Sequence, residues 1–129
     1  MSSRLFAQIF GAIYLIVGIL GFIPGIAQSS AAYGAGGAVL AGLFPVNYLH
    51  DVVHLILGIW GLASAGSMAR AVSFCRAFAV VLILLGIYGF FSAPTESLVP
   101  LGSPDTWLHL VSGVIAAYFG WGAPSKATA

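Results

Sequence analysis

The 129-residue chain is 60% hydrophobic and only 5% charged, with a net charge of +1. An ordinary soluble domain has about 25% charged residues, so this composition excludes a water-soluble surface and predicts a membrane protein surrounded by a lipid bilayer. Nucleic-acid binding is excluded as well, because it requires clustered Lys and Arg. The single cysteine, Cys75, excludes an internal disulfide framework, and we interpret it as a small apolar filler.

Four apolar stretches predict helices over residues 5–24, 46–65, 74–92 and 106–122. A helix crosses the hydrocarbon core with about 20 residues, and backbone groups in lipid must be bonded internally, so helices are favoured over strands. We therefore expect one integral membrane domain over residues 1–129. The first stretch also resembles a secretory signal, but the internal repeat described next argues that it is retained.

A short motif of small residues around bulky ones recurs in all four stretches. It reads GILGF at 18–22, GIWGL at 58–62, GIYGF at 86–90 and, in weaker form, AYFGW at 117–121. The positions eight residues earlier are Phe10, His50, Phe78 and His109, so the first helix corresponds to the third and the second to the fourth. This pattern predicts an all-α, up-down-up-down bundle of four transmembrane helices, built as a duplicated helical hairpin. Shared packing needs are the alternative origin, because small residues let membrane helices approach closely.

The charges predict the orientation. All four basic residues lie before the first stretch, between the second and third, or after the fourth: Arg4, Arg70, Arg76 and Lys126. By the positive-inside rule, both termini are then cytoplasmic. Glu96 and Asp105 fall at the outer side. The outer segment 25–45 is rich in Gly, Ala and Ser, and we expect it to lie along the membrane interface without regular structure.

Helix 46–65 has the most informative polar face. At about 100° per residue, His50, Asp51 and His54 share a face with Asn47 and with the small residues Gly58, Gly61 and Ala65. Helix 106–122 places His109 on a similar face, at nearly the depth of His50. Ionisable residues inside membranes usually face an interior or a cavity. We therefore predict that the three imidazoles converge near the outer face of the bundle.

Two kinds of ligand fit such a site. Gly18 and Gly86 reach the depth of His54 and are expected to leave space, so that a haem or chlorin pigment could bind between opposed histidines. Alternatively, the three histidines, with Asp51 or Asp105, form an acceptable ligand set for a Zn or Cu ion. The predicted cofactor-binding residues are therefore His50, His54, His109, Gly18 and Gly86, and the predicted metal ligands are His50, His54, His109 and Asp51.

Each polar residue also has a structural interpretation. If Asn47 is the helix N-cap, His50 lies in the first turn near the headgroups and needs no ligand. Asp51 could accept a proton from His54, three residues later. Asp105 is expected to cap the fourth helix, and His109 could bond Ser112 or a backbone carbonyl.

The stretch 44–55, FPVNYLHDVVHL, followed by the glycines of 58–62, resembles an uncharacterised bacterial membrane family with four spans, a domain of unknown function. The resemblance covers most of the chain and implies a multi-pass protein of the bacterial inner membrane. It implies no catalytic residues.

These features predict a small, non-enzymatic integral membrane protein that binds haem, a pigment or a metal ion. The first alternative is an accessory subunit that packs against neighbours in a larger membrane complex. The third alternative is a transporter or membrane enzyme. A single copy with four helices leaves little room for a substrate pathway, so such a protein would have to form a homo-oligomer.

Overall fold

The computed structural model describes residues 2–93, 95, 100 and 104–122. It is mostly helical, with four main helices. They are α1 (Ser3–Leu20), α2 (Tyr48–Ser64), α3 (Met68–Gly89) and α4 (Pro104–Ala117), and α4 continues as a π-helical turn, η3 (Tyr118–Gly122). Helix α3 begins six residues earlier than predicted, because the side chain of Ser67 caps it by accepting from the Arg70 N–H.

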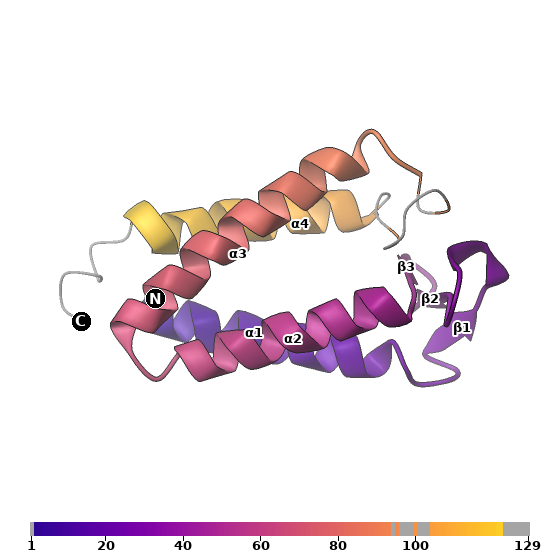
Figure 1. Ribbon diagram of the computed structural model, residues 1–129, viewed down its shortest axis with the longest axis horizontal. Helices are drawn as coiled ribbons and strands as arrows, with labels where there is room; N and C mark the ends of the chain where they lie inside the picture. Colours follow the sequence, from indigo (N-terminus) through magenta and orange to yellow (C-terminus); the bar gives the residue numbers. More distant parts are fainter. Residues whose placement is uncertain (1, 94, 96–99, 101–103, 123–129) are drawn as a thin grey trace.

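The helices form two antiparallel hairpins, α1 with α2 and α3 with α4 (Figure 1). The hairpins meet at the end where α1 begins, α2 turns into α3 and η3 ends, and they diverge toward the opposite end. Arg4 and Arg70 lie in the first turns of α1 and α3, and Arg76, further along α3, contacts η3 at the same end. Glu96 and Lys126, two other charged residues used to predict the orientation, lie outside the described residues.

Glycines set the close approach within each hairpin. A Cβ atom on Gly58 would collide with the backbone of Leu15, and one on Gly11 would lie 2.7 Å from the backbone nitrogen of Leu62. In the second hairpin, a Cβ atom on Gly113 would lie 3.1 Å from the backbone nitrogen of Ile83. Such contacts bring the two backbones of each hairpin into van der Waals contact.

Buried phenylalanines and the partly buried Phe10 fill the end where the hairpins meet. We call Phe6, Phe10, Phe74, Phe78 and Phe119 the aromatic cluster. Ring centroids lie 4.3 Å apart for Phe6 and Phe10, 5.0 Å for Phe74 and Phe78, and 5.3 Å for Phe6 and Phe119. Each such pair adds about 0.5–1.5 kcal/mol beyond the burial of its area. The cluster joins α1 and α3 to η3.

Hydrogen bonds close the same end. The Ser3 hydroxyl donates to the Phe119 carbonyl at 2.7 Å, and Arg4 Nε donates to the Ala65 carbonyl at the end of α2 at 2.8 Å. Arg76 Nε likewise donates to the Gly120 carbonyl in η3 at 2.7 Å. A cationic side chain therefore bonds the C-terminal carbonyls of both α2 and η3, where the helix dipole favours positive charge.

A small sheet at the opposite end corrects the expectation of an all-α fold. Strands β1 (Ala27–Ser29), β2 (Ala38–Leu40) and β3 (Phe44–Val46) pair antiparallel in that order, with Ala27 opposite Leu40 and Ala38 opposite Val46. Ala41 and Gly42 both have positive φ, as tight strand connections require. The inner face of the sheet packs against Val17 and Leu20 of α1. The segment predicted to lack regular structure thus forms a cover over α1.

Candidate metal site

The start of α2 positions the first histidine. Asn47 accepts a hydrogen bond from the backbone N–H of His50 at 2.8 Å, so the predicted N-cap is confirmed. The Asn47 amide also donates to the Tyr33 carbonyl at 3.1 Å, which ties the helix start to the segment between β1 and β2. His50 is therefore in the first turn, but it is buried rather than exposed to headgroups.

His54 lies one helical turn after His50 and faces the same way. Their ring centroids are 4.4 Å apart. The Tyr14 ring of α1 packs edge-on against His54 at 5.1 Å and against Phe78 at 5.0 Å. The Tyr14 hydroxyl also lies near Ser112 of α4. This tyrosine thus connects the aromatic cluster to the histidines and fixes one side of the His54 ring.

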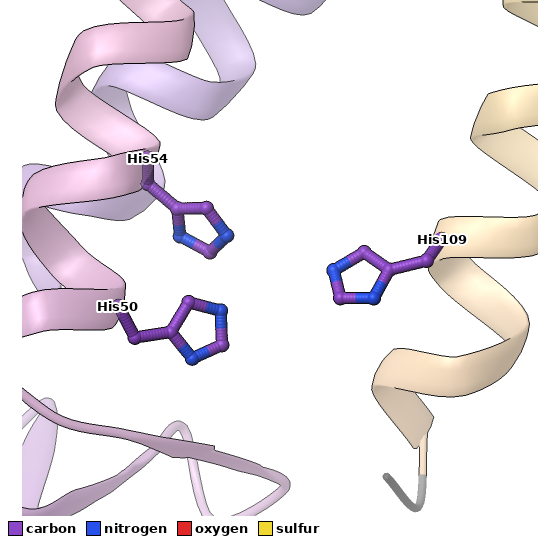
Figure 2. Close-up of side chains that lie close together, drawn as sticks. All are labelled: His50, His54 and His109. Carbon is purple, nitrogen blue, oxygen red and sulfur yellow. The ribbon is translucent and has the colours of Figure 1, made fainter. Parts of the chain in front are cut away.

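His109 approaches from the other hairpin. Figure 2 shows its ring pointing from α4 toward His50 and His54 on α2. One ring nitrogen from each of the three residues can be chosen so that all three atoms lie within 4.8 Å of one another. The predicted convergence of the imidazoles is therefore present in the structure. We call these three residues the histidine cluster.

The histidine cluster is buried and incompletely bonded. The side chains of His50, His54 and His109 are 2%, 8% and 3% exposed. The buried Nδ1 atom of each histidine has no hydrogen-bond partner among the described residues. A buried polar atom without a partner typically costs about 1–3 kcal/mol. Such groups in a native protein call for an explanation, of which an ion is one.

The space between the rings has the size of one atom. A void of about 20 Å³ is bordered by all three histidines together with Tyr14 and the aliphatic side chains Val53, Leu57, Leu82 and Leu85. An atom equidistant from three nitrogens 4.8 Å apart would lie about 2.8 Å from each, whereas Zn–N bonds are about 2.0–2.1 Å long. A shift of each ring by less than about 1 Å would therefore complete the coordination.

Asp51 does not join the histidine cluster. Its carboxylate packs against Gly21 at the end of α1, because successive helical residues point about 100° apart and Asp51 is turned away from His50. Within the described part of the chain, neither Asp51 oxygen has a hydrogen-bond partner, so the suggested Asp51–His54 bond is also not formed.

The predicted glycines do not border the cluster. A Cβ atom on Gly18 would lie 2.9 Å from the Leu55 side chain, and one on Gly86 would lie 2.6 Å from Leu110. The space that we expected beside these glycines is filled by the partner helix of each hairpin. Gly18 and Gly86 therefore serve helix packing in this structure.

Asp105 lies within α4 instead of capping it, since the helix already begins at Pro104. Pro is favoured at a first helical position. Asp105 is 4% exposed, and its Oδ2 atom is buried without a partner among the described residues. It lines a second, larger cavity of about 230 Å³ between α1, the sheet and α4, which Tyr14, His54 and His109 also border.

Tyr14 was not among the site residues that we predicted from the sequence. Its counterpart in the repeat is Leu82, so the repeat does not single it out. The available signal was a phenol hydroxyl in the middle of an otherwise apolar helix, where such a group usually has a polar partner.

Comparison with known protein families identifies one match. The family described as "Domain of unknown function (DUF4383)" matches residues 4–122. No curated protein and no solved structure matches the chain.

Proposed function

The chain belongs to this family of unknown function, and we propose from its own residues that it is a small integral membrane protein that holds one Zn²⁺ or Cu²⁺ ion. The ligands are His50, His54 and His109. The observation on which the proposal depends is the approach of three buried imidazole nitrogens to within 4.8 Å across the two hairpins.

The helix surfaces support a location in a membrane. Helices α1 and α3 are long and apolar enough to cross a bilayer, and the apolar α2 has 17 residues. Large aliphatic side chains are exposed along all four helices, among them Ile16, Ile56, Leu84 and Val114. A continuous apolar exterior of this kind suits lipid and would be a liability in water. We infer that all four helices span the bacterial inner membrane, with both termini cytoplasmic and the sheet outside.

The repeat supports a duplicated hairpin. A Cβ atom on Gly18 would lie 3.0 Å from the backbone oxygen of Asp51, and one on Gly86 would lie 3.3 Å from the backbone nitrogen of Leu110. Leu110 is the counterpart of Asp51 when His50 is aligned with His109. The matching glycines of α1 and α3 therefore meet matching positions of α2 and α4.

A single ion suits the site better than a haem or a chlorin. The space between the imidazoles is about 20 Å³, and even the adjoining cavity of about 230 Å³ is smaller than the 300–1,000 Å³ common for drug-sized ligands. Neutral imidazoles are good ligands for Zn²⁺ and Cu²⁺. The ion would also provide a partner for three ring nitrogens and would join α2 to α4.

The test is a metal titration of the purified, chelator-treated protein. We expect one Zn²⁺ or Cu²⁺ per chain, and lower affinity as the pH falls, because protons compete for the same nitrogens. His50→Ala, His54→Ala and His109→Ala should each weaken binding by more than about 100-fold, beyond the 10–100-fold typical of an outer-shell partner. Val52→Ala, on the exposed side of α2, is the matched control and should bind normally.

Two results would contradict the proposal. One is wild-type protein that takes up no stoichiometric ion, and the other is an ion retained by all three variants. Metal-free protein that co-purifies with partners and tolerates loss of the histidines would instead support an accessory subunit of a larger complex.

A further inference from the structure

The cavity of about 230 Å³ adjoins the small void between the imidazoles and shares Tyr14, His54 and His109 with it, but the rest of its lining is different. It lies between α1, the inner face of the sheet and the first turns of α4. Most of its wall is aliphatic and comes from Ile13, Val17, Leu20, Leu40, Val46 and Leu108. The sheet that the sequence did not predict therefore encloses an apolar compartment beside the histidine cluster.

The polar part of the cavity wall is a carboxyl group that lacks a hydrogen-bond donor. Asp105 lines the cavity, and its buried Oδ2 atom has no hydrogen-bond partner among the residues that the structure describes. The Tyr14 hydroxyl lies nearby but is not hydrogen-bonded to this oxygen. A buried carboxylate oxygen needs a donor, and a neutral carboxyl offers one O–H while its other oxygen can still accept a hydrogen bond. A molecule in the cavity can supply that donor.

Size and access restrict the molecule. An apolar cavity of about 150 Å³ accommodates benzene, so a cavity of about 230 Å³ admits one ring with a short substituent. Tyr14, His54 and His109 also line the cavity, and their ring edges suit an aromatic neighbour. Ile13 and Leu108 line the cavity and are also exposed on the helix surface. Entry is then from the lipid, which dissolves neutral molecules far better than cations.

We infer that this cavity binds a neutral single-ring phenol, with the ring among the aliphatic side chains and the hydroxyl donating to Asp105. This site goes beyond the metal site and does not depend on it, because Asp105 and the aliphatic wall are not metal ligands. Binding is therefore expected in metal-free protein as well.

The experiment measures binding of 4-ethylphenol and of ethylbenzene, which has the same shape without the hydroxyl, to full-length chelator-treated protein in lipid nanodiscs. Isothermal titration gives both affinities. We expect 4-ethylphenol to bind about tenfold more tightly, the value of one buried hydrogen bond. Asp105→Leu should abolish this preference, while Asp105→Asn, which keeps an acceptor oxygen, should retain part of it.

A cavity-filling variant separates the site from partition into lipid. Val17→Trp should reduce the binding of both compounds to the level of empty nanodiscs, while an unchanged helical circular dichroism signal reports that the bundle is folded. If Val17→Trp does not fold, Leu40→Phe provides the same test from the sheet side.

Three outcomes would overturn the inference. They are equal affinity for the two compounds in the wild type, a preference for 4-ethylphenol that survives in Asp105→Leu, and tighter binding of the cation 4-ethylbenzylamine. The last result would assign Asp105 to a charged ligand. Failure of phenol binding leaves the metal titration unaffected, so the two proposals fail separately.

Discussion

At the end of the bundle where the chain begins, buried rings contact one another, whereas the end beneath the sheet holds imidazoles and carboxyls that lack partners among the described residues. The aromatic cluster lies within a continuous apolar core. The histidine cluster borders two cavities. This difference agrees with our proposal that one end of the bundle joins the hairpins and that the other end holds a ligand.

The largest expected effect is in the aromatic cluster. Phe78→Ala removes a fully buried ring that contacts Phe6, Phe10, Tyr14 and Phe74, and it should lower the free energy of unfolding by about 3–5 kcal/mol. Denaturant titration in detergent measures it. Leu84→Ala, on the exposed face of the same helix, is the control and should change stability by less than about 0.5 kcal/mol. Equal effects of the two changes would remove the distinction between core and exposed positions.

Metal should raise stability through the histidine end. At a free Zn²⁺ concentration about 100 times the Kd, wild-type protein should gain about 2.7 kcal/mol, because the ion binds only the folded state. His109→Ala should show no such gain, since α2 and α4 are then no longer joined by the ion. Thermal unfolding with and without Zn²⁺ provides the measurement. A gain of similar size in His109→Ala would mean that the ion binds elsewhere.

A smaller effect is expected at the junction of the second hairpin. Arg76→Ala removes the hydrogen bond to the Gly120 carbonyl and the contact of the guanidinium with the Trp121 ring at 5.7 Å. We expect a loss of about 1–2 kcal/mol in unfolding free energy, with metal affinity unchanged. Arg70→Ala is the comparison, because Arg70 bonds only the nearby Ser67 side chain in the described structure. Weakened metal binding in Arg76→Ala would show that the two ends are coupled.

The smallest effect on stability is expected at the histidines themselves. In metal-free protein, His54→Leu replaces a buried imidazole without an Nδ1 partner by an apolar group of similar size, which is often neutral or stabilising. Unfolding free energy should stay within about 1 kcal/mol of wild type, while metal affinity is lost. A large destabilisation would instead make His54 a structural residue.

Much of the histidine cluster could be predicted from the sequence. The spacing of His50 and His54 places both on one helix face, and the repeat aligns His50 with His109 in depth. The periodicity could not reveal which neighbouring helix each side chain faces. It grouped Asp51 with the histidines, although the approach of α1 at Gly21 draws the carboxylate to that side. It also could not say that Leu55 and Leu110 fill the space left by Gly18 and Gly86.

The sheet was not predictable from hydropathy, because each strand has three residues and no alternating pattern can be read over so short a run. The sequence signals for its tight turns were glycines. Gly34, Gly36 and Gly42 lie in the segment that we expected to be irregular, and all three have positive φ in the structure. The cavity that the sheet encloses was unpredictable for the same reason.

X-ray absorption of the Zn²⁺-loaded protein is the decisive test of the proposed metal site, since it counts the imidazoles bound to the ion. We expect three imidazole nitrogens at about 2.0–2.1 Å from one ion per chain in the wild type, and two in His109→Ala at saturating metal. An ion with no more than one imidazole in the wild type, or an unchanged spectrum in His109→Ala, would contradict it.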